Sequence, residues 1–128
     1  GSPAPLRSDG YSSPSKKYQA GTFVPLAEAV KRKVKAAVAG VGKINTPEIA
    51  EAILSEGRVD LVAIARQLIA DPFWPRKVLE GRASEIVLCD SCNINCWLTL
   101  KPRRLPPDSS LCKFNERAGK EWEIPAPE

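Results

Sequence analysis

The sequence contains no histidine among its 128 residues, and it has only four cysteines. Without imidazole, a site for a soft transition metal in this chain must be built from cysteine sulfur. Four cysteines are also far below the density that is typical of small secreted proteins held together by disulfides. No apolar run approaches the ~20 residues that a membrane-spanning helix needs. These absences disfavour a disulfide scaffold and a membrane protein.

The charge balance is only mildly basic, with 19 lysines and arginines against 15 acidic residues and a net charge of +4. The densest basic run, residues 31–35, contains no aromatic residue and falls at a predicted helix C-terminus, where cations complement the helix dipole. We therefore expect no nucleic-acid partner. The first residues are rich in serine and proline, so no signal peptide is predicted, and unoxidised thiols favour the cytoplasm.

All four cysteines lie in one segment with the spacing C-x2-C-x3-C-x15-C. They are Cys89, Cys92, Cys96 and Cys112. Zinc ribbons usually present two separated Cys-x-x-Cys pairs, whereas here three cysteines lie within eight residues and the fourth follows alone. A three-plus-one distribution suits a [4Fe–4S] cluster. The spacing favours this cluster over structural zinc, and two disulfides are the weakest alternative.

The chain divides by composition into three parts, because its twelve prolines are concentrated toward the ends. Residues 1–21 are predicted to be an irregular N-terminal segment, 22–82 the regular core, and 83–128 the cysteine segment with an irregular tail. In the core, helical spacing of Phe23, Leu26, Val30 and Val34 predicts an apolar helix face, and Phe73, Val78 and Leu79 are expected to be apolar contacts of a later helix. In chain order we predict a helix over 23–33, a strand over 36–39, a helix over 47–56, a strand over 61–64, and short helices from 65 and over 71–80.

The order of these elements predicts an α/β fold. Strand, helix, strand and helix with short connections form a right-handed parallel βα pair, the unit of doubly wound sheets and of (β/α)8 barrels. The predicted strands are apolar throughout, which is typical of a sheet covered on both faces. Two parallel strands are not a finished sheet, so we expect another chain or a longer chain to supply the rest.

Small and basic residues follow both strands. Gly40 and Gly42 follow the first strand, where backbone N–H groups at a helix N-terminus favour an anion. Arg66 follows the second strand, where a guanidinium can make two parallel hydrogen bonds to a phosphate. Each feature alone has an ordinary explanation as a turn or a surface ion pair. Together they favour a phosphate site such as (β/α)8 barrels form after their last strands.

Three motifs carry a resemblance to a known family. Residues 38–48 (Val-Ala-Gly-Val-Gly-Lys-Ile-Asn-Thr-Pro-Glu), 60–66 (Asp-Leu-Val-Ala-Ile-Ala-Arg) and 70–72 (Ala-Asp-Pro) resemble the last two βα units of the old yellow enzyme family. The cysteine segment, followed by Asn115 and by residues 118–121, is similar to the iron–sulfur branch of that family, which includes 2,4-dienoyl-CoA reductase and trimethylamine dehydrogenase.

The resemblance implies a (β/α)8 barrel that holds FMN, with a [4Fe–4S] cluster that exchanges electrons with the flavin. Residues Gly40, Gly42, Lys43 and Ala65 would lie at the FMN phosphate through backbone groups, and Arg66 through its side chain. The four cysteines would be the cluster ligands. Relatives usually have glycine where Ala65 stands, which leaves less room for the phosphate.

The resemblance covers only the end of the barrel, so the catalytic His and Tyr positions are absent and no catalytic residue is predicted. We expect a small C-terminal subunit or fragment that forms a hetero-oligomer with a chain carrying the first six strands. The assembled enzyme would act on the C=C bond of an enoyl thioester or similar carbonyl compound, or on the C–N bond of a methylated amine. The alternative is a zinc-binding structural or assembly subunit derived from such an enzyme.

Overall fold

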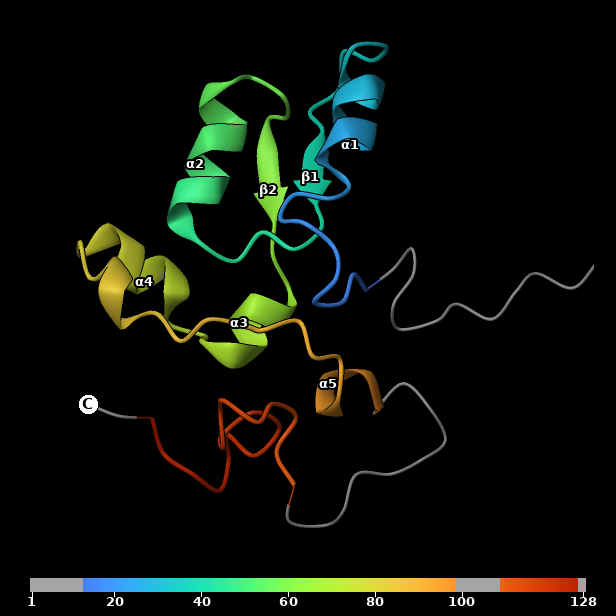
Figure 1. Ribbon diagram of the computed structural model, residues 1–128. Coiled ribbons are helices and arrows are strands. Elements are labelled where there is room, and N and C mark those ends of the chain that lie inside the picture. Colours follow the sequence, from blue (N-terminus) through green and yellow to red (C-terminus); the bar gives the residue numbers. More distant parts are fainter. Residues whose placement is uncertain (1–12, 99–108, 127–128) are drawn as a thin grey trace, which may run out of the picture. The chain divides into compact units, whose positions relative to one another are not determined.

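The computed structural model describes residues 13–98 and 109–126, so residues 1–12 and 99–108 of the predicted irregular segments lie outside it. The chain forms two compact units, Gly1–Ile64 and Ala65–Glu128. No helix in the described ranges is long and apolar enough to cross a bilayer. The elements are α1 (Val24–Lys31), β1 (Ala39–Val41), α2 (Pro47–Ser55), β2 (Leu61–Ala63), α3 (Arg66–Ala70), α4 (Trp74–Leu79), the 3-10 turn η1 (Ala83–Glu85) and α5 (Asn95–Leu98) (Figure 1).

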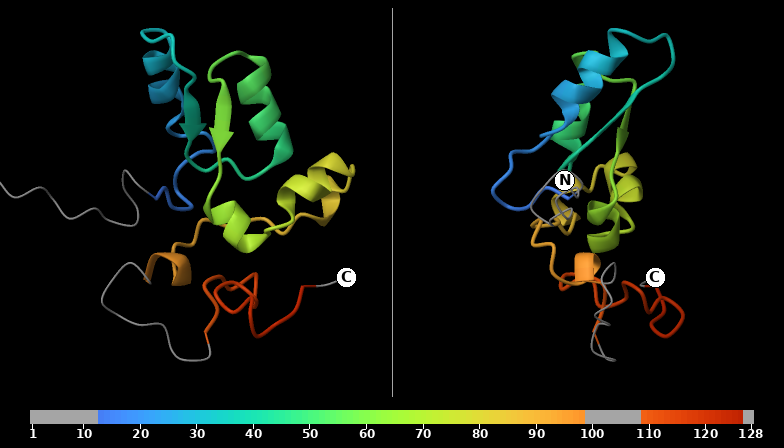
Figure 2. Two further views of the ribbon diagram at one scale, coloured as in Figure 1. Left: turned by 180° about the vertical axis from the view of Figure 1, so that it is seen from behind. Right: turned by 90° about the vertical axis from the view of Figure 1, so that its right-hand side faces the viewer.

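The first unit is built on two parallel strands. Ala39 of β1 lies opposite Leu61 of β2, and the pairing ends with Val41 opposite Ala63. Helix α1 packs beside β1 and α2 packs beside β2, an arrangement that both directions of view show (Figures 1 and 2). The predicted α/β class and the parallel βα pair are therefore confirmed.

Helix α2 begins and ends where local chemistry predicts. Thr46 is extended and its side-chain oxygen accepts a hydrogen bond from the Ile49 N–H at 3.4 Å, while Pro47 occupies the first helical position. Gly57 follows the helix with a φ of +68°, the left-handed conformation that glycine adopts without steric cost. These short-range signals explain why this helix was predicted well.

Replacing Thr46 with alanine is expected to lower the free energy of unfolding by about 1 kcal/mol, because one N–H of the first turn loses its acceptor. Urea denaturation of the chain measures this value. Thr46→Ser keeps the hydroxyl and serves as the control, with an expected change of only a few tenths of a kcal/mol. Equal stability of Thr46→Ala and the wild type would show that the cap contributes nothing.

The first strand lies later in the chain than predicted. Ala36 and Ala37 are exposed and irregular, and β1 starts at Ala39. The reason is a tertiary anchor: Asp60, at the start of β2, accepts a hydrogen bond from the Val38 N–H at 2.9 Å and donates its own N–H to the Val38 carbonyl. Strand pairing is therefore set by the partner strand and not by the apolar run.

One face of the strand pair is bare in this chain. Val41 is 49% exposed and Leu61 is 57% exposed, whereas on the other face Gly40 is buried against Val59. The predicted apolar face of α1 is also largely exposed, at Leu26, Val30 and Val34. The described residues cover these side chains only in part, so the expected covering of both faces stays a prediction.

In the second unit, short helices surround a small core that contains Trp74 and Ala118. Helix α4 lies within the predicted 71–80 range and is followed by Gly81 at a φ of +71°. Leu79, predicted as an apolar contact, is instead 88% exposed, so its apolar character does not contribute to this core. Among residues 109–126 the structure shows turns and one isolated bridge, as expected for an irregular tail.

Candidate functional site

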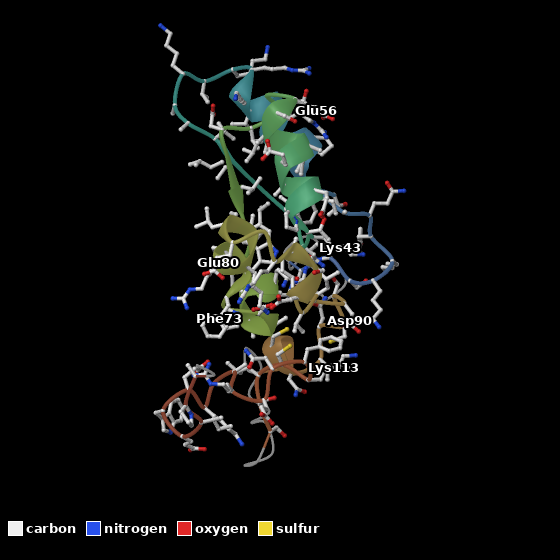
Figure 3. All side chains as sticks on the ribbon, turned by 90° about the vertical axis from the view of Figure 1, so that its left-hand side faces the viewer. Lys43, Glu56, Phe73, Glu80, Asp90 and Lys113 are labelled. Carbon is white, nitrogen blue, oxygen red and sulfur yellow. The ribbon has the colours of Figure 1, made fainter. Side chains whose placement is uncertain are left out.

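One pocket in the second unit is lined by all four cysteines. Its cavity volume is about 20 Å³, and it opens to solvent. Arg66 and Lys113 also line it, together with apolar side chains such as Ile69 and Phe114. In Figure 3 the yellow sulfur atoms lie close to the labelled Asp90 and Lys113, which belong to the same pocket. None of the cysteines forms a disulfide, so the disulfide alternative is not borne out.

The loop that carries the first three cysteines turns sharply around Cys92. Ser91 and Asn93 have φ values of 57° and 55°, a left-handed conformation that non-glycine residues adopt infrequently. The Cys92 N–H donates to the Asp90 carboxylate at 3.0 Å, and the Ser91 N–H donates to the Cys89 sulfur at 3.4 Å. Local strain of this kind persists only where the surrounding structure supports it, and it is concentrated at binding sites.

Gln67 of α3 anchors the start of this loop. Its side chain is buried, and its amide nitrogen donates to the Val87 carbonyl at 2.8 Å while its amide oxygen accepts from the Cys89 N–H at 2.9 Å. Both polar ends of the amide are therefore satisfied inside the protein. Sequence reasoning missed this residue, and a polar side chain in an otherwise apolar stretch was the one available signal.

Asp71 anchors the same loop from the end of α3. Its side chain is 3% exposed and accepts hydrogen bonds from the Phe73 N–H at 3.1 Å, the Lys77 amino group at 2.7 Å and the Val87 N–H at 2.9 Å. Burial opposes ionisation of this carboxyl, but the Lys77 and backbone hydrogen bonds outweigh it and lower the pKa. The sequence predicted only the helix start at this position.

Two asparagines bring Cys112 to the other three cysteines. Asn95 donates to the Ser110 carbonyl at 2.9 Å, and Asn115 donates to the Ile69 carbonyl at 2.8 Å. Cys112 and Asn115 also form a short antiparallel bridge. These contacts show how Cys112 reaches the pocket although fifteen residues separate it from Cys96. Asn115 was predicted only as part of the family resemblance.

The surroundings of Cys89 and Cys96 disfavour the thiolate form of these two side chains. Burial raises the pKa of Cys89, and burial together with the charge of Cys89 raises that of Cys96. The positive charge of Arg66 acts in the opposite direction on both thiols. A bound metal must therefore displace their protons, and metal binding should release protons to solvent.

The arrangement of the thiols can be compared with the two predicted metal groups. No three of the described Cys, Asp and Glu side chains are placed to hold one metal ion. A tetrahedral zinc site with Zn–S bonds of about 2.3 Å needs sulfurs only about 3.8 Å apart. A four-iron cluster spreads its thiolates over a larger cube. The four thiols share one pocket, and the choice between a cluster and zinc stays a prediction.

A buried hydroxyl in the cysteine loop is a second feature that bears on what this pocket could bind. Ser91 is 1% exposed, and within the described residues its Oγ has no hydrogen-bond partner. An unsatisfied buried hydroxyl costs about 1–3 kcal/mol, so native proteins rarely keep one without reason. A sulfur-rich group bound by the neighbouring cysteines would offer acceptors in this loop.

The predicted phosphate residues of the first unit have clear structural roles. A Cβ on Gly40 would lie 3.0 Å from a methyl group of Val59, and a Cβ on Gly42 would lie 2.9 Å from the Phe23 ring. Gly42 also has a φ of +116°. The Lys43 amino group donates to the Lys16 and Tyr18 carbonyls, and its backbone carbonyl accepts from the Gly21 N–H at 3.4 Å.

The other two predicted phosphate residues belong to the second unit. Ala65 precedes α3 and is exposed, and Arg66 is the first residue of that helix. The Arg66 guanidinium lines the cysteine pocket and donates a hydrogen bond to the Asn93 side-chain oxygen. The structure therefore joins Arg66 to the four cysteines, a connection that the sequence did not indicate.

A parallel βα pair followed by a pocket that four cysteines line defines an α/β protein with a thiol-lined pocket. Comparison with known families identifies the kind of α/β protein. Residues 7–85 match the NADH:flavin oxidoreductase / NADH oxidase family, and the chain belongs to this family. The resemblance stated from the sequence motifs is thereby confirmed, and the family implies FMN as the cofactor.

Individual relatives cover more of the chain. It is 52% identical over 80 residues to the NADH oxidase of Thermoanaerobacter brockii, which covers 62% of this chain and 12% of that protein. It is 39% identical over 104 residues to the metal reductase of Desulforamulus reducens, and the match covers 81% of this chain and 15% of that protein. A solved structure of 2-naphthoyl-CoA reductase in complex with 2-naphthoyl-CoA matches with a TM-score of 0.76 at 33% identity. The match covers 89% of this chain and 17% of the reductase chain. The chain thus spans less than a fifth of each relative.

Proposed function

We propose that this chain is the C-terminal, cluster-bearing part of an oxidoreductase that uses FMN and a [4Fe–4S] cluster. The observation that carries the proposal is the pocket lined by all four cysteines, immediately after a segment of the flavin oxidoreductase family. The four cysteines would hold the cluster. When bound, the cluster supplies single-electron transfer to or from the flavin, which itself mediates hydride chemistry.

The bare apolar faces support an incomplete barrel. Val41 and Leu61 project from the face of the strand pair opposite to Gly40 and Val59. Exposed apolar patches of this kind mark surfaces that another element covers. We propose that β1 and β2 are the last two strands of a (β/α)8 barrel, whose first six strands come from a partner chain or from the remainder of a longer chain.

The FMN phosphate site is proposed at the ends of these two strands. Gly40, Gly42 and Lys43 would contribute backbone groups after β1, and Ala65 and Arg66 would contribute after β2. Backbone N–H groups near a helix N-terminus favour an anion, which supports the assignment. The substrate would be an enoyl thioester or similar carbonyl compound, or a methylated amine. The thioester named in the 2-naphthoyl-CoA reductase structure supports the first class.

Metal and flavin analysis of anaerobically purified native protein tests this proposal, with any copurifying chain included. We expect about four irons and four sulfides per chain, a broad visible absorbance and bound FMN. One zinc per chain without iron or sulfide would contradict the proposal and would support the structural subunit instead. The expected cytoplasmic location is consistent with thiols that must stay reduced.

A further inference from the structure

Arg66 is held in place against the cysteine pocket. It is half-buried at the first position of α3, and its guanidinium donates to the side-chain oxygen of Asn93. Asn93 lies between Cys92 and Cys96 in the strained part of the loop and lines the pocket itself. The hydrogen bond therefore fixes a guanidinium beside the thiols by attaching it to the loop that carries them.

The charge of Arg66 would act on the thiols as well as on the proposed FMN phosphate. Among the described residues no Asp or Glu forms an ion pair with Arg66, whereas Lys113, the second cation lining the pocket, pairs with Asp90 at 2.8 Å. Arg66 and the four cysteines line the same pocket, so its charge lies beside the thiols.

A metal group with four thiolate ligands is negatively charged, and each electron that it accepts adds one more negative charge. A fixed cation stabilises the reduced form more than the oxidised form, and partial burial strengthens the effect because solvent screens it less. We propose that Arg66, held by Asn93, raises the reduction potential of the group bound by the four cysteines. This inference rests on the proposed function, because it requires that the cysteines hold a redox-active cluster.

Reductive titration of the cofactor-loaded protein, followed by visible absorbance and electron paramagnetic resonance, tests the inference. Arg66→Gln removes the charge and should make the reduction equilibrium about tenfold less favourable, which corresponds to a midpoint about 59 mV lower for one electron. Asn93→Asp has the same shape but places a carboxylate on the guanidinium, so it should lower the midpoint in the same direction. Arg66→Lys keeps the charge and should retain most of the wild-type potential.

The control is Arg82→Gln, because Arg82 is exposed and pairs with Glu80 and Glu85 away from the pocket. We expect Arg82→Gln to change the reduction equilibrium less than twofold. Unchanged potentials in Arg66→Gln and Asn93→Asp, with iron and sulfide intact, would overturn the inference. Loss of FMN from Arg66→Gln at an unchanged potential would also overturn it and leave Arg66 as a flavin ligand only. Absence of iron and sulfide in the wild type would overturn the proposed function itself.

Discussion

Replacing Cys92 with serine should cause the protein to lose its cluster or to keep only a degraded one. Cys92 is the central one of the three proposed ligands in the loop, and its position is set by the left-handed residues Ser91 and Asn93 and by the hydrogen bond to Asp90. A serine hydroxyl has nearly the same shape but is a much harder and less acidic ligand than a thiol. We expect iron and sulfide to fall well below four per chain and the visible absorbance to disappear.

The effect of Cys92→Ser should also appear in the thermal stability of the protein. Metal binding contributes to the free energy of folding, so the variant should unfold at a lower temperature than the loaded wild type. Ser84→Ala is a suitable control, since Ser84 is exposed in η1 and does not line the pocket. Full retention of iron, sulfide and absorbance in Cys92→Ser would show that this residue is not a ligand.

Replacing Asp71 with asparagine should be the most damaging substitution outside the cysteines. The carboxylate accepts three hydrogen bonds, including one from the Lys77 amino group, whose side chain is only 15% exposed. An amide offers one acceptor oxygen, and its NH2 group would face a donor. Removing one partner of a buried ion pair costs about 3–5 kcal/mol, which denaturant unfolding of the chain can measure.

The effect of Asp71→Asn should reach the cysteine loop, because Asp71 accepts the Val87 N–H two residues before Cys89. Iron retention should therefore decrease together with stability. Glu80→Gln is the matched control, since the ion pair between Glu80 and Arg82 is exposed and should contribute at most about 1 kcal/mol. If Asp71→Asn lowered the free energy of unfolding no more than Glu80→Gln does, Asp71 would not be an anchor of the cysteine loop.

The stabilising effect of Asp71 should depend on pH in a defined direction. Its pKa in the folded chain lies below the ordinary value of 3.8, so folding favours the ionised form. This contribution is fully present above 3.8 and is lost as the pH falls through the lower folded pKa. The stability difference between the wild type and Asp71→Asn should therefore narrow in acid, whereas a constant difference would exclude ionisation as its source.

Short-range signals made much of the fold predictable. The sequence around Thr46 and Pro47 predicted the start of α2, and Gly57 predicted its end, because caps depend on neighbouring residues alone. The strand over 36–39 was misplaced, since its register depends on Asp60, more than twenty residues away. Periodicity likewise placed Leu26, Val30 and Val34 on one helix face but gave no information on what covers that face.

For the site, the sequence alone determined which ligand type is available. Without histidine, a soft-metal site in the cysteine segment would have to use sulfur, and the motifs around Gly42 and Arg66 indicated the flavin oxidoreductase family. Only the tertiary structure showed that Gln67 and Asp71 anchor the cysteine loop and that Arg66 lies beside the thiols. The physical reason is that ligand type follows from residue identity, whereas orientation and electrostatics depend on contacts between residues 16 to 27 positions apart.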